Sequence, residues 1–479
     1  MARITTYQDL EKAKAQGDAE LARFVASTVA SYVQGEPYKT AILADEYDRQ
    51  ENRTIREFVK VLRTVNGAVV PDQYGSNERI ACNFFHRLIV QRAMYSLGNG
   101  VSFVQPDEPA AADKVKPLLG PEFDKVLVDA AVDSLKHSVS FLFWNRDRVH
   151  EFPMTEFCAL PDERDGTMRA GIRFWRLDRS SPMTYVLYEA DGYTEYAEGN
   201  NGRLDVVQPK RAYVVTYSTV PADGIDEVVG EENYDGLPVV PLWANRTKTS
   251  AIVGMRGNID NYDVIKSGFA NDLRDCAQVY WLIENAPAMT DEDMQLFLDK
   301  LWANHVASVA NADEARVTPY AQDIPHEARE ALLDRIQADL YRDFGALDVH
   351  TVQAGATNDH IDAAYQPMDE EAAFFEYQIA EAVRALLRLQ GIDDGPVFRR
   401  SRISNQYEQV QMVAMEAQWL DRATVLRKLP NLTPEEVEAV LLADEREVFA
   451  RVLPTYGQQQ QPTEEEPPQE EPAEQTAEA

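Results

Sequence analysis

The hydrophobic pattern changes its period twice along this chain, and these changes limit the possible fold more than any other feature. Up to residue 138, apolar residues recur every three or four positions, as at Leu21, Val25 and Val29, which indicates amphipathic helices. From 139 to 220 they alternate, in β-branched and aromatic runs such as VSFLFW and TYVLYEA. The helical period then returns. The sequence therefore predicts an α+β fold that is mainly helical, with one small antiparallel sheet at 139–220.

Two long helices are predicted in the second half, at about 257–284 and 325–345, with a compact insertion between them. On the first helix, Ile259, Tyr262, Ile265 and Phe269 mark a packed face, because they step by three or four positions. A second, polar stripe contains Asp260, Asp263, Asn271 and Arg274. Such an acidic stripe is more often a solvated face than a binding site.

Four other segments are predicted from their hydrophobic period, from residues that interrupt helices and from composition. A helix is predicted at 78–97. Residues 347–360 have no clear period and contain Gly355, so we expect a loop. The helix expected at 361–390 contains Pro367, which should kink or break it. The tail 457–479 is rich in Glu, Pro and Gln without Lys or Arg, and should be disordered.

Charge and motifs argue against several functions. The chain has 47 Lys and Arg against 80 Asp and Glu, a net charge of −33, whereas proteins that grip nucleic acid present basic patches. Its three cysteines, Cys82, Cys158 and Cys276, form no metal-binding spacing. Phosphate-binding glycine motifs, a signal peptide and a long apolar span are also missing. We therefore expect a chain that is not an enzyme, has no cofactor or metal, and does not enter a membrane.

Four stretches resemble the portal, or head-to-tail connector, proteins of long-tailed bacteriophages. Each is compatible with the family's pattern, and the run from 236 to 285 is the most specific. The stretches are Phe24 to Gly35, Gly236 to Asn245 (GLPVVPLWAN), Ser250 to Asn285 with Gly257 to Tyr262 (GNIDNY), and Leu429 to Glu436 (LPNLTPEE). Together with the order of elements, the resemblance covers residues from about 20 to 450. The sequence departs from the family's common Ser-Gly pattern at 347–368.

The resemblance implies a dodecameric ring around a central DNA channel, at the portal vertex of the virion. It implies a wing at 1–245, stem helices at 250–284 and 325–345, a clip at 285–324, a tunnel loop at 347–360, a kinked wing helix at 361–395, a crown at 396–456 and the free tail at 457–479. The loop residues expected to face DNA are Asp348, His350, Gln353, Thr357, Asn358, Asp359 and His360.

The implied partners are further copies of this chain, double-stranded DNA, a terminase, a head-completion adaptor, and capsid and scaffold proteins. Assembly would take place in the host cytoplasm. An acidic wall suits a conduit, because Lys and Arg contacts to phosphate would hold the duplex in place. Two alternatives stay open at this point. One is an acidic cytoplasmic interaction protein, and the other is a metal-dependent nuclease that uses scattered carboxylates.

Overall fold

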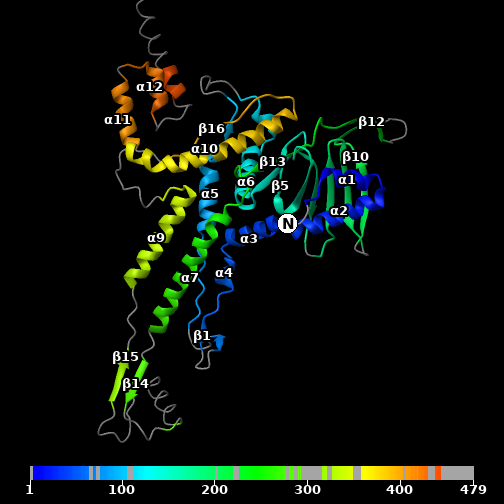
Figure 1. The fold of residues 1–479 in the computed structure, drawn as a ribbon. Helices are drawn as coiled ribbons and strands as arrows, with labels where there is room; N and C mark the ends of the chain where they lie inside the picture. The colour runs from blue at the N-terminus through cyan, green and yellow to red at the C-terminus, as the bar shows by residue number, and fades with distance from the viewer. Residues whose placement is uncertain are drawn as a thin grey trace, which may run out of the picture. The chain divides into compact units, whose positions relative to one another are not determined.

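The computed structural model combines helices and strands, in agreement with the predicted α+β class (Figure 1). It describes residues 4–63, 68–71, 76–104, 113–178, 180–199, 203–219, 226–276, 280–284, 290, 292, 316–320, 326–348, 358–402, 406–417, 419–429 and 437–443. The chain forms two compact units, one made of Met1–Thr351 and Ala364–Arg402, the other of Val352–Ala363 and Ile403–Ala479. Most of the expected clip and the whole tail 457–479 lie outside the described residues.

The first helices of the chain cover a five-stranded antiparallel sheet. Helices α1 (Tyr7–Lys14) and α2 (Asp18–Val33) turn over Gly17, whose φ of +105° suits a residue without a Cβ. Val25 and Val29 pack on Ile172 and Leu187 of the sheet. The sheet order is β10-β9-β8-β7-β6, with β6 at Phe157–Pro161, β7 at Met168–Trp175, β8 at Thr184–Glu189, β9 at Gly192–Glu198 and β10 at Leu204–Arg211.

The prediction of a single sheet at 139–220 is wrong. Strand β4 (Val139–Trp144) belongs to a second sheet, between β5 (Val149–Pro153) and β13 (Val239–Trp243), which lies well beyond the predicted block. All residues of β4 are buried, since helix α6 (Phe123–His137) packs on this second sheet. β11 (Val214–Thr219) pairs separately with β12 (Asp226–Glu232). The local pattern predicts strands, but it does not specify their neighbours.

The largest core joins segments from all along the first unit. Helix α5 (Phe84–Leu97), helix α6, the first turns of helix α7 (Ile252–Cys276), the end of helix α9 (His326–Phe344) and the middle of helix α10 (Asn358–Arg388) bury their apolar faces there. The smaller elements of the first unit are α3 (Glu36–Asp48), α4 (Arg53–Arg56), β1 (Val61–Arg63), β2 (Val69–Pro71), β3 (Val101–Ser102), η1 (Lys116–Leu119) and η2 (Met154–Glu156).

Helix α10 does not break at its proline. It runs through Pro367 for 31 residues, so of the two expected outcomes, a kink or a break, the break does not occur. The end of α9 lies against this part of α10. A Cβ on Gly345 would come within 2.7 Å of Glu371 Cγ and 3.4 Å of the Pro367 carbonyl oxygen. Gly345 also has a φ of +64°, which ends α9 in the left-handed conformation that glycine favours.

Residues 397–402, assigned to the crown from sequence, belong to the first unit. Strand β16 (Val397–Phe398) pairs with β3, and the Ser401 amide donates to the Tyr95 carbonyl oxygen at 2.9 Å. In the second unit the structure describes helices α11 (Gln406–Glu416) and α12 (Arg422–Lys428). Asp421 caps α12 by accepting from the Thr424 amide at 3.1 Å.

Candidate functional site

The two long helices expected as a stem, α7 and α9, lie side by side in the first unit (Figure 1). Near the end of α7, the Phe269 ring meets the His326 ring edge to face at 5.5 Å. Beside it, Arg329 of α9 forms an ion pair with Asp272 of α7 at 2.6 Å. Toward the other end, Ile336 and Leu340 of α9 are buried in the main core. These contacts hold the pair of helices as one element.

The first of these helices is shorter than predicted. It ends at Cys276, and Tyr280–Glu284 form strand β14, which pairs antiparallel with β15 (Arg316–Tyr320). The prediction of helix up to 284 is therefore wrong. The hydrophobic spacing of the segment YWLIE fits a helix, but its aromatic and β-branched residues also favour a strand. Pairing with 316–320 selects the strand. The strand pair joins the ends of α7 and α9 in the chain.

The middle of the polar stripe of α7 is buried, so its interpretation as a solvated face is wrong there, although Arg274 at its end is exposed. Asp263, Ser267 and Asn271 are 0%, 0% and 2% exposed. Their side chains accept the backbone N–H groups of an extended segment that runs antiparallel to the helix. Cys82 donates to Asp263 Oδ1 at 2.8 Å, Ile80 to Ser267 Oγ at 2.9 Å and Glu78 to Asn271 Oδ1 at 2.5 Å. We call these three pairs the amide ladder.

The spacing of the amide ladder follows from backbone geometry. Four helical residues rise about 6 Å, and two extended residues span about 6.6 Å. Every second amide of 78–82 therefore meets a side chain one turn further along α7. This use of the segment also explains why the helix predicted from residue 78 begins only at Phe84. The stripe could have revealed the ladder from sequence only if the extended segment had been identified as its partner.

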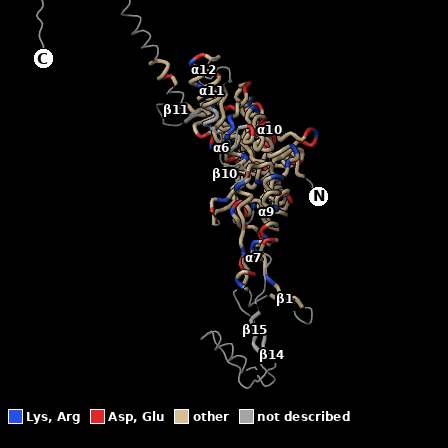
Figure 2. The backbone as a smooth tube through the Cα atoms, turned by 90° about the vertical axis from the view of Figure 1, so that its left-hand side faces the viewer, with Lys and Arg blue, Asp and Glu red and all other residues tan. Residues whose placement is uncertain are grey.

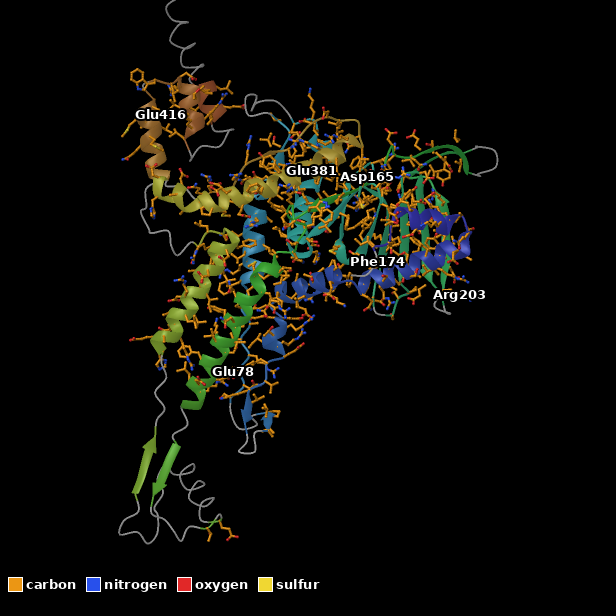
Figure 3. The ribbon with its side chains drawn as sticks, viewed as in Figure 1. Glu78, Asp165, Phe174, Arg203, Glu381 and Glu416 are labelled. Atoms are coloured by element: carbon orange, nitrogen blue, oxygen red, sulfur yellow. The ribbon has the colours of Figure 1, made fainter. Side chains whose placement is uncertain are left out.

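The other predicted stripe residues extend the same contact. Asp260 Oδ2 accepts the Thr54 hydroxyl at 2.8 Å, and Asp260 Oδ1 accepts the Tyr47 hydroxyl. Arg274 forms an ion pair with Glu78, which lies beside the C-terminal half of α7 (Figure 3). All four predicted residues therefore bind the segment 47–82, with α9 on another face of α7.

Asp263 is the most buried carboxyl of this contact. Burial raises its pKa, although hydrogen bonds from Asn52 and Cys82 oppose the shift. Asn52 Nδ2 donates both to Asp263 Oδ2 at 2.5 Å and to the Cys82 carbonyl oxygen at 3.2 Å. Asn52, Asp263 and Cys82 thus form a polar network inside the protein, in which Asn52 Oδ1 has no hydrogen-bond partner among the described residues.

The expected tunnel loop is described only at its edges. Leu347 is buried, and its carbonyl oxygen accepts from Gln91 Nε2 at 2.9 Å. Asp348 is the only predicted loop residue described before α10, while His350, Gln353 and Thr357 lie outside the described residues. The remaining three, Asn358, Asp359 and His360, form the start of α10, so their assignment to a loop is wrong. A carboxylate such as Asp359 in a first turn favours the helix because it interacts with the helix dipole.

Charged residues of both signs lie along α7 and α9 (Figure 2). Helices α7 and α9 contain six Lys and Arg against nine Asp and Glu. Within the described part of the chain, no three His, Cys, Asp or Glu side chains are grouped as metal ligands. In the same part, no helix is long and apolar enough to cross a membrane.

Comparison with known proteins decides the family. The family model described as "Phage portal protein, SPP1 Gp6-like" matches residues 29–448, most of the chain. The chain belongs to this phage portal family. It is also similar to the portal protein of Clostridium phage phiCD119, with 21% identity over 448 residues that cover 87% of this chain and 97% of that protein.

Membership in the portal family confirms the resemblance inferred from the four stretches. It gives the chain a structural role as a portal protein, a capsid-associated oligomer through which phage DNA passes. For a portal-family chain, α7, α9 and the amide ladder are the parts of the candidate site that the structure describes best.

Proposed function

We propose that this chain assembles as a closed dodecameric ring at one vertex of a phage capsid, and that double-stranded DNA is packaged and ejected through its central channel. In this proposal α7 and α9 form the stem, within the bounds 252–276 and 326–344. Identical copies would meet through heterologous interfaces, which close into a ring when the rotation between copies is a whole fraction of a turn.

The state of the stem arginines is the observation that carries this proposal. Every arginine of α7 and α9 already has a carboxylate partner in its own chain. The pairs are Arg256 with Asp260 at 3.3 Å, Arg274 with Glu78, Arg329 with Asp272 at 2.6 Å, and Arg335 at 3.4 Å and Arg342 with a shared Asp339. A cation that is already paired with a carboxylate neutralises phosphate weakly and releases few of the counterions condensed on DNA, so it contributes little to binding the duplex.

The unpaired charges of the second stem helix are negative. Glu327, Glu330 and Asp334 are exposed on α9, and none has an ion-pair partner among the described residues. A stem with neutralised arginines and free carboxylates repels a duplex weakly at short range, over about 8 Å at physiological salt. Such a wall lets a charged polymer slide.

The remaining assignments follow the family's organisation. We propose that the segment 285–324, between the two stem helices, is the clip that binds the terminase and later the head-completion adaptor. Residues 1–245 would form the wing and contact capsid and scaffold proteins, and 403–456 the crown. The segment 347–357, with Asp348, His350, Gln353 and Thr357, would form the tunnel loop facing DNA. Assembly would occur in the host cytoplasm.

Electron microscopy of the purified protein, with mass determination on the same sample, tests the ring. We expect closed rings with a central hole and a mass near twelve copies of 54.1 kDa. A strict monomer at every protein and salt concentration would contradict the ring and favour an acidic interaction protein. Mg²⁺-dependent cleavage of plasmid DNA would instead favour a nuclease.

A further inference from the structure

Helix α10 presents two aromatic side chains to solvent. Phe374 and Tyr377 are 71% and 70% exposed, although Phe375 between them is buried in the core. They lie on one stripe of the helix, since positions three and four apart share a face. Large exposed aromatics are costly in water, and aromatic residues are enriched in the centres of protein interfaces.

A groove of about 550 Å³ lies beside this stripe, within the first unit. Its walls come from the loop 244–251, the first turn of α7, the last turn of α9 and the middle of α10, with Phe374 among them. Its apolar lining includes the buried side chains of Leu135, Met255 and Phe344. The groove therefore extends the exposed aromatic surface into a concave apolar site.

The rim of the groove carries one unpaired charge of each sign. Arg246 of the loop and Asp343 of α9 both line it, and neither has an ion-pair partner among the described residues. By contrast, Arg92 and Glu371, which also line it, neutralise each other at 3.3 Å. An occupant that fits this rim is apolar at its centre and carries both a carboxylate and a cation.

Charged residues of both signs also lie along α10, on the same stripe as Phe374 and Tyr377. Glu370, Glu381, Arg384 and Arg388 share the stripe with Phe374 and Tyr377, and no ion pair involves them within the described chain. DNA or a purely basic peptide would leave one sign unmatched. A second copy of this chain carries apolar residues with both signs, so it satisfies the whole surface.

We propose that Phe374 and Tyr377, together with the adjoining groove, bind a second copy of this chain. The proposal rests on the proposed ring, because it assigns one of the contacts that close it. It locates that contact at the meeting point of α7, α9 and α10, where the two stem helices join the body of the first unit.

The test combines a charge substitution with a photochemical cross-link. The double variant Phe374→Asp with Tyr377→Asp should raise the protein concentration needed for assembly by about tenfold or more, since central aromatic contacts contribute strongly to interfaces. Mass photometry measures the assembly. Leu177→Asp is the matched control, because Leu177 is 88% exposed and lies outside this surface, and its assembly should equal that of the wild type. Circular dichroism melting should be unchanged in both.

Benzoyl-phenylalanine in place of Phe374 then identifies the occupant. We expect cross-linked products in which both peptides come from this chain. If the wild type forms rings and the double variant assembles normally, this contact is overturned but the ring is not. The same holds if the cross-link forms only to a different phage protein. A wild-type chain that never associates would overturn the ring and the contact together.

Discussion

Asp263 is fully buried on α7, and its two oxygens accept from the Cys82 amide and from Asn52. Replacing it by Leu leaves the Cys82 amide without a partner in the interior, and it removes one of the two acceptors of Asn52 Nδ2. Each buried unpaired group costs about 1–3 kcal/mol, so we expect Asp263→Leu to lower the free energy of unfolding by more than an ordinary surface change. Urea unfolding followed by circular dichroism measures this loss. A Leu variant as stable as the wild type would show that the amide ladder does not anchor the segment.

Asp263→Asn is the matched variant, because it keeps an oxygen acceptor and removes the charge. Burial raises the pKa of Asp263, so its protonated form is favoured in the folded state. Its contribution to stability is present below the pKa of the unfolded chain and is lost as the pH rises through the folded pKa. We therefore expect the stability of the wild type relative to Asp263→Asn to decrease as the pH rises from about 4. A pH-independent difference would contradict this.

Glu151 provides a second pH-dependent residue, on strand β5. Burial, and then the negative charge of Asp133, raise its pKa to about 7. Its stabilising protonated form is therefore lost as the pH rises through neutrality, and the free energy of unfolding should fall between about pH 5 and 8. Glu151→Gln stays neutral and can still accept from Ser140, whose hydroxyl lies 2.6 Å from Glu151 Oε1. We expect this variant to show a flatter pH profile in thermal unfolding, and an equally steep profile would refute the assignment.

The polar stripe of α7 shows what can be predicted at the level of residues. The three- and four-residue steps from Asp260 to Arg274 correctly identified one polar face of the helix. The partner could not be found, because residues 78–82 also fit the start of a helix and contain no polar pattern of their own. Their contribution to the ladder is made by backbone amides, which every residue type except proline has.

Elements were predicted well where the local pattern agreed with the tertiary partner. Strands β4 and β8 lie close to the predicted runs VSFLFW and TYVLYEA, and α9 lies close to its predicted bounds. The prediction of a helix at 280–284 was wrong, because these residues pair as a strand with 316–320 although their pattern also fits a helix. Helix α10 continues through Pro367, and its buried residues Ala372, Phe375 and Ile379 show that packing supports the helix beyond the missing hydrogen bond.

The segment 397–402 is held to α5 and α10 by a shared carboxylate. Asp369 accepts from Tyr95 at 2.6 Å, from Arg400 at 2.8 Å and from Arg402. Although burial opposes ionisation, these hydrogen bonds hold the pKa of Asp369 below its usual value. Asp369→Asn should cost about 1.5–3 kcal/mol of unfolding free energy near neutral pH, since hydrogen bonds to charged groups contribute about that much.

Hydrogen exchange measured by mass spectrometry checks this prediction locally. We expect residues 397–402 to exchange faster in Asp369→Asn than in the wild type, whereas exchange in β7 should be the same in both proteins. The contribution of a carboxyl with a lowered pKa is present above the unfolded pKa and is lost as the pH falls through the folded pKa. The difference between wild type and Asp369→Asn should therefore shrink below about pH 4. Glu370→Gln, one residue along the same helix, serves as the control and should leave the segment's exchange unchanged.

For the whole molecule, the order of elements carried more information than any single motif. The four stretches and the two long helices around an insertion sufficed to assign the portal family, which the family model then matched over 29–448. The division of the described strands between 139 and 243 into three separate sheets could not be predicted, because β13 pairs with β4 across about a hundred residues of chain. The net charge of −33 predicts a weak affinity for DNA, and the structure adds that every arginine of α7 and α9 has a carboxylate partner.

If carboxylates neutralise the arginines that line a DNA channel, removing one of these carboxylates should raise the affinity of the channel for DNA. Asp339 is the shared partner of Arg335 and Arg342, whose side chains are 72% and 61% exposed. Asp339→Ala frees both, so we expect assembled rings of this variant to bind a short duplex more tightly than wild type at about 50 mM salt. The gain should disappear near 200 mM, because each phosphate contact adds about 0.9 to the salt slope.

Fluorescence anisotropy with a labelled duplex at several salt concentrations measures this effect. Asp334→Ala is the control, since it removes one negative charge from the same helix without freeing an arginine among the described residues. If both variants gain equal affinity, net charge alone governs the interaction. If neither does, the outer face of α9 does not meet the duplex, and the lining of the channel must be sought on α7 or on the segment 347–357. A gain confined to Asp339→Ala would mean that α9 faces the passing DNA and that its ion pairs keep it from holding the duplex.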